Sequence, residues 1–489
     1  MTDSEDPNVP LLGTPRKNKF EKTFVALLLF SLCFTSNVII SLLYPFAPGH
    51  ISRQGYGPVF IGMLFSVYSW AILLFSPVGA VLVRWFGRDA MLSSGISMLA
   101  VFSATFGYAR QLSFGSTSVM AAVYTASRVL SGCGASIVNL AVFSMAADTF
   151  PNDLGKIMGA NEVVIGLGFT IGPLIGSLLY VNFGFGPAFL ITGAAVFLAL
   201  PVAIAKRVAC GGGEKTLAEE SAGLATGDAA SGVNGFLRVV NLRVVLAGTL
   251  CFCGTLVFGV MEPSLAQHLE EKTGLGQTAI GLVFAMFSAV YSIFGVPMGW
   301  IADNRGHFLL STIGVLVSGL CLFLFGLPIY GAVGDALGMS SEKVILGKDL
   351  ALLVLLGVGQ ATLLVPTLPA IKEGSPHRDP AATEAVVAIF NCFQQLGLAV
   401  GPLVGAAMVK ALSYETALLL TGAALLLFGV VCILDMALDR NVGCPDEEAP
   451  AAVPTEEDGT EECSETSCAV AGSDRADSRR CSLSLSPRP

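Results

Sequence analysis

The sequence has few charged residues: Asp, Glu, Lys and Arg make up only 13% of its 489 residues. A soluble globular protein carries about a quarter. At the same time 53% of the residues are hydrophobic, and they form runs of about 20 residues, the length that spans a bilayer as an α-helix. The scarcity of charge therefore excludes a soluble enzyme and predicts a protein embedded in a lipid bilayer.

Other familiar patterns are missing as well. The 12 cysteines are scattered, several of them inside apolar runs, and have neither metal-site spacing nor a disulfide framework. No nucleophile–base set, phosphate-binding loop or metal cluster stands out, and no basic patch indicates nucleic acid. We therefore expect no catalytic residue, no metal, no cofactor and no nucleic-acid partner, and an enzyme is the least favoured class.

Twelve apolar runs are present, in two sets of six separated by a linker rich in Gly, Ala and charge. This layout is typical of the major facilitator fold and predicts an all-α membrane protein with twelve transmembrane helices in two pseudo-symmetric six-helix halves. The tail has 11 Asp and Glu against four Arg from position 441 onward, which predicts disorder. The expected segments are a cytosolic N-terminal segment at 1–22, an N-terminal half at 23–206, a cytosolic linker at 207–243, a C-terminal half at 244–437 and an acidic cytosolic tail at 438–489. The expected spans lie near 24–46, 59–83, 90–109, 118–145, 157–181, 186–206, 244–266, 278–301, 308–331, 349–371, 383–409 and 413–437.

An internal repeat supports the two halves independently of the number of spans. Residues 61–87 align without a gap on residues 280–306. In that register Phe65 corresponds to Phe284. A repeat of this length predicts that the two halves are duplicated.

Basic residues near the span ends indicate the orientation. With the N-terminus in the cytosol, 15 Lys and Arg lie on the cytosolic side and six on the opposite side. Cytosolic loops carry the excess of basic residues. Both termini are therefore expected to face the cytosol.

The span expected at 278–301 ends in the G-x-L-A-D-x-x-G loop signature of major facilitators. Its main positions here are Gly299, Asp303 and Gly306. The glycines permit close helix approach and a sharp turn, and Asp303 can accept hydrogen bonds from a neighbouring helix N-terminus. Such a latch could hold one gating state, with an ordinary cytosolic turn as the alternative. The copy in the first half is degraded, because Arg84 stands at the position of the Asp.

The span expected at 157–181 carries a glycine–proline motif that resembles the fifth-helix motif of proton-coupled antiporters. Its members are Gly159, Gly168, Gly172, Pro173 and Gly176. Glycines let helices pack closely, and the proline frees a backbone carbonyl and allows a bend. The span expected at 383–409 repeats the core as Gly401 and Pro402. Generic packing of small residues is the alternative interpretation.

Ionisable side chains inside the apolar spans are the candidate coupling residues. Arg128 begins an R-x-x-S-G-x-G-A pattern similar to that of proton-coupled facilitators. A charged side chain near the centre of a bilayer costs at least about 2.5–3.5 kcal/mol to insert. Arg128 must therefore face a cavity or a partner side chain, and Glu162 and Glu262 are the candidate partners. Glu262 precedes Pro263, so we expect an interrupted helix and a proton acceptor that attracts cations. Structural pairing and, for Glu262, an interfacial helix end are the alternatives.

These features resemble the vesicular amine transporter family over nearly all of residues 24–437. The family's span 7 sequence appears as MEPSL at 261–265. The sequences VPTLP at 365–369 and FPN at 150–152 are most similar to the vesicular polyamine transporter branch. The resemblance implies proton-driven loading of amines from the cytosol into acidic vesicles.

The chain departs from the monoamine members of that family at several positions. Ser36 and Asn391 stand where those members carry an acid, and Tyr68 stands where they carry a Lys. Gln360 lies near the position of a further missing acid. Because the polyamine branch also has Ser at the position of Ser36, the resemblance favours polyamines over serotonin or dopamine as the substrate.

The sequence thus predicts an alternating-access antiporter, functional as a monomer, that exchanges protons for a small cationic amine in a secretory-type vesicle or another acidic organelle. Protons that leave the acidic lumen would pass through Glu262, and Arg128 would modulate the pKa of its carboxyl group. Helix alignment places five polar side chains in the substrate cavity, where tyrosines suit a cation. They are Ser36, Tyr44, Tyr68, Asn391 and Gln394. A broad drug–proton antiporter at the plasma membrane, a passive uniporter and a non-transporting membrane sensor or scaffold are the open alternatives.

Overall fold

The computed structural model describes residues 19–150, 154–201, 239–327, 342–375 and 380–442. The chain divides into two units, Met1–Ala437 and Leu438–Pro489. The first contains the helical bundle, and the described part of the second is the end of its last helix. Most of the expected N-terminal segment, linker and acidic tail lie outside the described residues.

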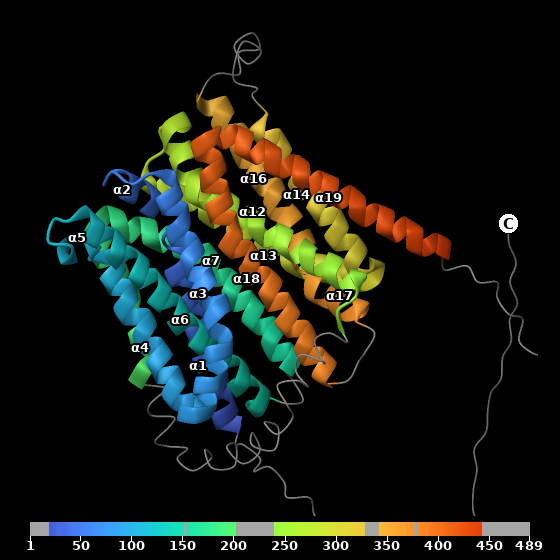
Figure 1. The fold of residues 1–489 in the computed structure, drawn as a ribbon, viewed down its shortest axis with the longest axis horizontal. Coiled ribbons are helices and arrows are strands. Elements are labelled where there is room, and N and C mark those ends of the chain that lie inside the picture. Colours follow the sequence, from blue (N-terminus) through green and yellow to red (C-terminus); the bar gives the residue numbers. More distant parts are fainter. Residues whose placement is uncertain (1–18, 151–153, 202–238, 328–341, 376–379, 443–489) are drawn as a thin grey trace, which may run out of the picture. The chain divides into compact units, whose positions relative to one another are not determined.

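Throughout the described residues, all regular secondary structure is helical (Figure 1). The helices of the N-terminal half are α1 (Lys19–Ser41), α2 (Ala47–Ser52), α3 (Pro58–Phe86), α4 (Arg88–Gly107), α5 (Ala109–Leu112), α6 (Thr117–Thr149), α7 (Leu154–Phe183) and α8 (Phe185–Phe197). Those of the C-terminal half are α12 (Leu242–Thr273), α13 (Gln277–Arg305), α14 (His307–Gly326), α16 (Glu342–Leu364), α17 (Thr367–Gly374), α18 (Pro380–Ala411) and α19 (Tyr414–Val442).

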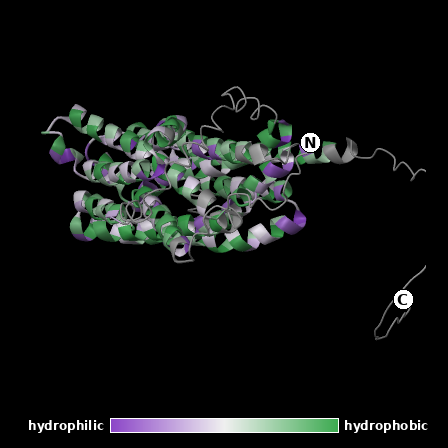
Figure 2. Ribbon diagram, turned by 90° about the horizontal axis from the view of Figure 1, so that it is seen from below, coloured by the Kyte–Doolittle hydropathy of each residue, from purple (hydrophilic) through white to green (hydrophobic). Residues whose placement is uncertain are grey.

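Eleven of the described helices are long and apolar enough to cross a membrane, and a shorter apolar helix, Phe185–Pro201, takes the place expected for the sixth span. Apolar residues cover most of the helix surfaces in Figure 2. Helices suit this environment because they satisfy their own backbone hydrogen bonds. The predicted all-α membrane fold is confirmed.

Two spans differ from the expectation in ways that matter for the site. The first helix stops at Ser41 instead of reaching position 46, and a turn at 42–46 carries Tyr44 before α2 begins. The tenth span breaks into α16 and α17 at Pro366, which has no N–H to continue the helix. The Thr367 hydroxyl donates to the Leu364 carbonyl (2.6 Å), so a carbonyl at the break keeps a partner.

The internal repeat reappears as two matching helices, α3 and α13. Each has 29 residues and follows an extended glycine, Gly57 or Gly276, that lies 219 positions from its counterpart. Each ends at a glycine with positive φ, 81° at Gly87 and 99° at Gly306. Only glycine adopts such a conformation readily, so both turns require it.

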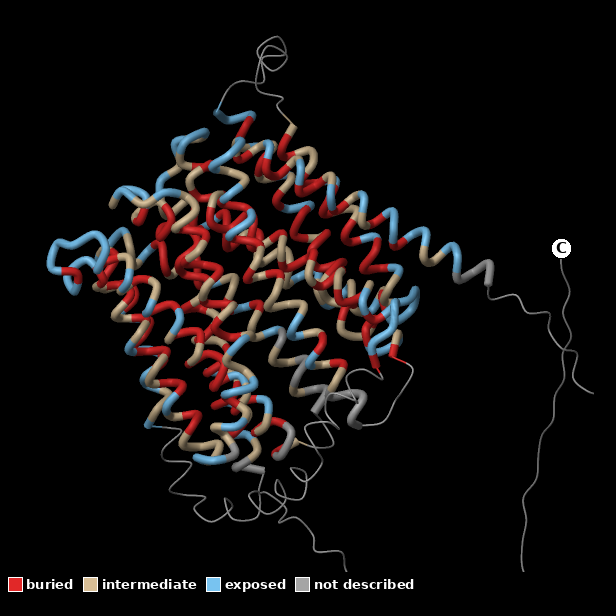
Figure 3. The backbone as a smooth tube through the Cα atoms, in the orientation of Figure 1, coloured by how far each residue is buried: buried red, intermediate tan, exposed pale blue. Residues whose placement is uncertain are grey.

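The halves meet through two equivalent pairs of helices, α3 with α18 and α7 with α13. We call the side at which α1 and α12 begin the near side, and the side at which α3 and α13 begin the far side. The first part of α3 (61–72) and of α13 (280–287) is largely buried, whereas their near-side ends are much more exposed (Figure 3). The halves are therefore closed against each other on the far side.

Candidate transport site

Glu262 lies in the middle of a continuous helix. Helix α12 runs on for eleven residues after it, through Pro263, so the expected interruption and the interfacial helix end are both wrong. The ring of a helical proline presses on the residue four positions earlier, which here is Gly259. A Cβ on Gly259 would lie 2.9 Å from the Cα of Gly401 in α18. The tight packing of α12 on α18 thus supports the helix across the proline, and Glu262 is left only 7% exposed.

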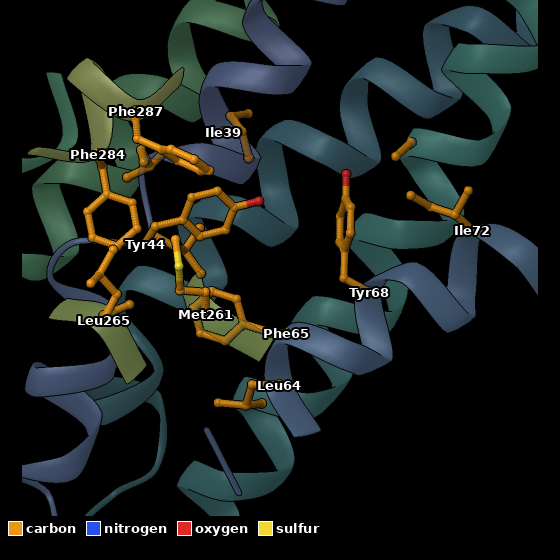
Figure 4. Close-up of a cluster of buried hydrophobic side chains, with 14 of the residues drawn as sticks. Ile39, Tyr44, Leu64, Phe65, Tyr68, Ile72, Met261, Leu265, Phe284 and Phe287 are labelled. Carbon is orange, nitrogen blue, oxygen red and sulfur yellow. The ribbon is translucent and has the colours of Figure 1, made fainter. Parts of the chain in front are cut away.

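Tyr44 interacts electrostatically with the Glu262 carboxylate. The Tyr44 ring packs among three phenylalanines, with ring centroids 5.9 Å from Phe65, 6.2 Å from Phe284 and 6.4 Å from Phe169. Phe65 and Phe284 correspond in the internal repeat, and Figure 4 shows them on either side of Tyr44. One tyrosine from the α1–α2 turn therefore closes the space between equivalent rings of the two halves.

Arg128, on α6, is 5% exposed and sits over the Tyr68 ring, 4.4 Å from its centroid. Its Nε donates to the Leu64 carbonyl (3.3 Å). Among the side chains that the structure describes, no carboxylate lies within ion-pair distance of this guanidinium; the Glu162 side chain is outside that set. Arg128 and Glu262 do not form a direct pair, and Tyr44 interacts electrostatically with both.

The other expected cavity residues fall into two groups. Ser36 and Tyr68 are buried, and neither hydroxyl has a hydrogen-bond partner. Asn391 is exposed on α18, where its amide donates to the Val387 carbonyl (3.0 Å), and Gln394 is partly buried one turn further on. Buried hydroxyls usually have a partner, so the unpartnered hydroxyls of Ser36 and Tyr68 set them apart from the other expected cavity residues.

The glycine–proline motif lies where α7 crosses α1. A Cβ at Gly168 would come within 2.9 Å of Asn37, one at Gly172 would overlap the Ser41 hydroxyl, and one at Gly176 would lie 2.6 Å from the carbonyl of the residue that follows α1. The Pro173 carbonyl faces Gly281 of α13. The surroundings of Gly159 lie outside the described residues.

The loop signature forms a cluster of charged side chains on the near side. His307, the first residue of α14, contacts Asp303 (3.0 Å) through Nε2 and Glu373 of α17 (2.6 Å) through Nδ1. The partner of Asp303 is thus this side chain instead of the expected backbone N–H groups. Gly299 lies near Val365, 3.6 Å from a Cβ built there, and Gly306 provides the turn described above.

A contact between the halves on the far side was missed at the sequence level. Arg53, next to α2, forms an ion pair with Glu270 of α12 (2.8 Å), and Gln277 donates to the same carboxylate (3.1 Å). Gln267 donates to the Pro48 carbonyl (3.4 Å). Nothing in the sequence marks these residues, because charged and amide side chains at helix ends are ordinary surface features.

Comparison with known proteins gives transporters throughout. The chain is 26% identical over 473 residues to the MFS-type transporter SLC18B1 of Rattus norvegicus, covering 93% of this chain and 97% of that protein. It is 24% identical to SLC18B1 of Homo sapiens, covering 92% and 96%. It is also 25% identical to the chromaffin granule amine transporter of Homo sapiens, covering 76% and 64%. The predicted resemblance to vesicular amine transporters is confirmed, and the relatives are not enzymes.

Solved structures agree on the fold. A bacterial homologue of the human lysosomal transporter Spinster superposes with a TM-score of 0.65 at 13% identity, covering 89% of this chain and all of that one. A D-xylose–proton symporter gives a TM-score of 0.59 at 14% identity, covering 85% and 97%. The profile of the Major Facilitator Superfamily matches residues 25–339 and 244–465. The chain belongs to the Major Facilitator Superfamily and is a multi-pass membrane transporter of a small solute.

Proposed function

We propose that this transporter exchanges protons for a cationic amine, polyamine-like, by alternating access. The near side, which carries the excess of Lys and Arg, faces the cytosol, and the far side faces the lumen of an acidic vesicle. The protein works as a monomer. The similarity to SLC18B1 and to amine transporters of granules and synaptic vesicles supports both the substrate class and the compartment.

The proposal rests above all on the setting of Glu262. It is buried in the middle of the bundle, and among the described residues no Lys or Arg lies within ion-pair distance of its carboxylate. An ionisable side chain inside a membrane is expensive and marks a functional site by default. A carboxylate without a cationic partner can bind either a proton or an ammonium group, and competition between the two is what an antiporter requires.

The aromatic side chains around Glu262 suit the same substrate. Arg128 covers one face of Tyr68 and phenylalanines stack on Tyr44 in this state, so the two rings would bind an ammonium group only after these side chains shift. The Ser36 and Tyr68 hydroxyls can accept hydrogen bonds from its N–H groups. The positive charge of Arg128 helps to expel a cation from the site once Glu262 takes up a proton.

We further propose that the closed far side marks one of the two access states. Opening it requires separation of the α3–α18 and α7–α13 pairs and of Arg53 from Glu270. The glycine contacts at Gly172 and Gly401 permit the helices to shift while they stay packed. The cluster at Asp303 would hold the near side of the C-terminal half during this change.

The test is uptake of labelled spermidine into proteoliposomes with an acidic interior, comparing the wild type with Glu262→Gln. The matched control is Glu271→Gln, the same change on the same helix at an exposed position. We expect wild-type uptake that collapses when the proton gradient is dissipated, a loss of roughly 100-fold in Glu262→Gln, as for a lost charge-assisted contact of about 3 kcal/mol, and no loss in the control.

Each other outcome removes a defined part of the proposal. Unaltered uptake by Glu262→Gln would exclude this carboxylate from the mechanism. Uptake that persists without a proton gradient would indicate a passive uniporter. Failure of the wild type to take up spermidine, with uptake of unrelated cationic drugs, would indicate the broad drug–proton antiporter. Failure with every cation would exclude a cationic substrate, and the remaining candidates would be another small solute or a sensor or scaffold without transport.

A further inference from the structure

A second group of ionisable side chains is buried at the far end of the C-terminal half, apart from the Glu262 site. Its centre is His268, on α12, whose side chain is 3% exposed, with Nε2 at 3.2 Å from Oδ2 of Asp349 on α16. The Asp349 side chain is 0% exposed. Two fully buried ionisable groups on adjacent membrane helices require a partner or a function, and the transport site uses neither of them.

Each helix packed around His268 contributes to its surroundings. From α19, Glu415 lies 4.0 Å from His268 Nδ1, and the Tyr414 ring centroid is 4.4 Å from that of the imidazole. From α16, Lys348 lies 3.4 Å from Asp349, and from α12 itself Lys272 lies 3.4 Å from Glu415. Helix α14 adds the uncharged ring of Phe325, 5.8 Å away. Two carboxylates therefore face one histidine, and each carboxylate also lies close to a lysine.

This arrangement distinguishes the two charge states of the imidazole. A neutral ring donates from one nitrogen only, so it can satisfy Asp349 or Glu415 but not both. A protonated ring donates from both nitrogens and adds a positive charge beside two carboxylates whose own charges are otherwise balanced by the lysines. Protonation therefore ties α12 more firmly to α16 and α19 at the same time.

The same helix reaches both of the features described above. Glu262 lies six residues before His268, and Glu270, two residues after it, is paired with Arg53 of the N-terminal half. Pulling the end of α12 toward α16 and α19 draws it away from the N-terminal half. Histidine is the side chain whose charge ordinarily changes between about pH 5 and 8, the range that separates cytosol from an acidic lumen.

We propose that His268 and Asp349 form a second proton-binding site, separate from Glu262, through which the pH on the far side promotes opening of that side. The site is a positioning element for transport and touches no substrate. Its role in uptake rests on the proposed proton–amine exchange, whereas proton binding itself does not.

The first experiment requires no transport: the Tm of the purified full-length protein at pH 5.5 and pH 7.5, for the wild type and His268→Gln. We expect the wild-type advantage over the variant to grow by about 1 °C on acidification, because the Tm shift produced by a given change in stability becomes smaller as the chain becomes longer. An advantage that is equal at both pH values would show a purely structural pair and overturn the proposal.

His50→Gln gives a control with the opposite sign. Burial, with the nearby positive charges of Arg53 and Arg110, lowers the pKa of His50 from 6.5 to about 4, so the folded state disfavours its protonation. Stability is then lost as pH falls from about 6.5 toward 4. His50→Gln removes that loss together with the ring's contacts to Tyr180 and Gln54, so the wild-type advantage over it should shrink on acidification, whereas the advantage over His268→Gln should grow.

The second experiment measures the initial rate of spermidine uptake at interior pH 5.5 and 7.5, with the exterior adjusted to keep the gradient constant. We expect the wild-type rate to be about fivefold higher at pH 5.5, the lower end of coupling between two sites. His268→Gln should transport with less than about a twofold difference, and His50→Gln should match the wild type. A His268→Gln profile identical to the wild-type profile would overturn the role in uptake.

The Tm and uptake experiments test the proposed proton site and the proposed transport function separately. If the wild type takes up no spermidine, the proposed function fails while the Tm experiment still tests the proton site. If His268→Gln does not fold, Asp349→Asn keeps the imidazole and removes one of its carboxylates. That variant should lose the acid-dependent Tm advantage, and a retained advantage would count against the pair.

Discussion

The N-terminal and C-terminal halves have matching helices but different buried charges. Helices α3 and α13 agree in length and in both glycine caps, and α7 and α18 place equivalent Gly–Pro steps against α1 and α12. In the N-terminal half, the charged side chain buried among the described residues is Arg128. The C-terminal half buries Glu262 and the His268–Asp349 pair. Duplication thus accounts for the frame, and later divergence accounts for the chemistry.

The difference also indicates which features both halves must keep and which feature only one half needs. Side-chain size and backbone shape must be kept in both halves, because each helix crossing depends on close approach. A buried charge needs only one copy, since the halves share one central site. In the proposed mechanism the equivalent halves move against each other, while the proton chemistry is concentrated in one of them.

After the roughly 100-fold loss expected for Glu262→Gln, the largest expected effect on uptake comes from removing the buried charge of the N-terminal half. Arg128→Gln should lower the initial uptake rate by at least about tenfold, the effect of roughly 1.4 kcal/mol, because the cation near Tyr44 is lost. Arg128→Lys should fall in between, since it keeps the charge but not the planar stacking on Tyr68. Uptake assays in proteoliposomes measure both.

The double variant Arg128→Gln with Glu262→Gln extends this test. If the two charges act on one path through Tyr44, the double variant should transport no worse than Glu262→Gln alone. Fully additive losses would mean that the charged residues of the two halves act independently.

The second prediction compares equivalent glycines. In Gly401→Ala the new Cβ would meet the Gly259 Cα and the Leu256 carbonyl at 2.9 Å, whereas in Gly172→Ala it would meet chiefly the Ser41 hydroxyl. Backbone cannot move aside as a hydroxyl can, so Gly401→Ala should destabilise more, by about 1–3 kcal/mol. Tm of the purified variants gives the order.

Adding Ser41→Ala provides the control for that comparison. It should restore most of the Tm lost in Gly172→Ala, because it removes the overlapping oxygen. A Gly172→Ala loss equal to that of Gly401→Ala, with no rescue by Ser41→Ala, would contradict the proposed difference between the two crossings.

The smallest expected effect concerns the contact that joins the halves on the far side. The Arg53–Glu270 pair is partly exposed, and such pairs contribute about 0–1 kcal/mol. Arg53→Glu should therefore raise the population with an open far side by up to about fivefold. A thiol introduced as Ser66→Cys, next to the Ala399 carbonyl of the other half, should then react faster with a reagent added from the far side.

Combining Arg53→Glu with Glu270→Arg recreates the pair in reverse. The reaction rate of the introduced thiol should return to the value seen without the charge changes. If the reversed pair reacts as fast as Arg53→Glu alone, the ion pair does not hold the far side closed.

Much of the frame was predictable from local features. The apolar runs, the two sets of six spans and the alignment of Phe65 with Phe284 follow from composition and spacing. Arg128 and Glu262 were also recognisable, because a charged residue inside an apolar run seldom has a purely structural role. The interruption at Pro263 was predicted wrongly, because a proline weakens a helix considered by itself. The packing of Gly259 on Gly401, which supports the helix, joins residues 142 positions apart and cannot be seen in the local sequence.

The sequence by itself determined the membrane class, the duplicated halves and the identity of the ionisable residues within the spans, because each depends on neighbours along the chain. Only the tertiary structure decided which of those residues meet. It brought Tyr44 within electrostatic reach of both Arg128 and Glu262, joined Arg53 to Glu270 across the halves, and buried His268 against an aspartate 81 positions away. Such contacts depend on how helices cross, and helix crossings are set by the packing of many side chains at once.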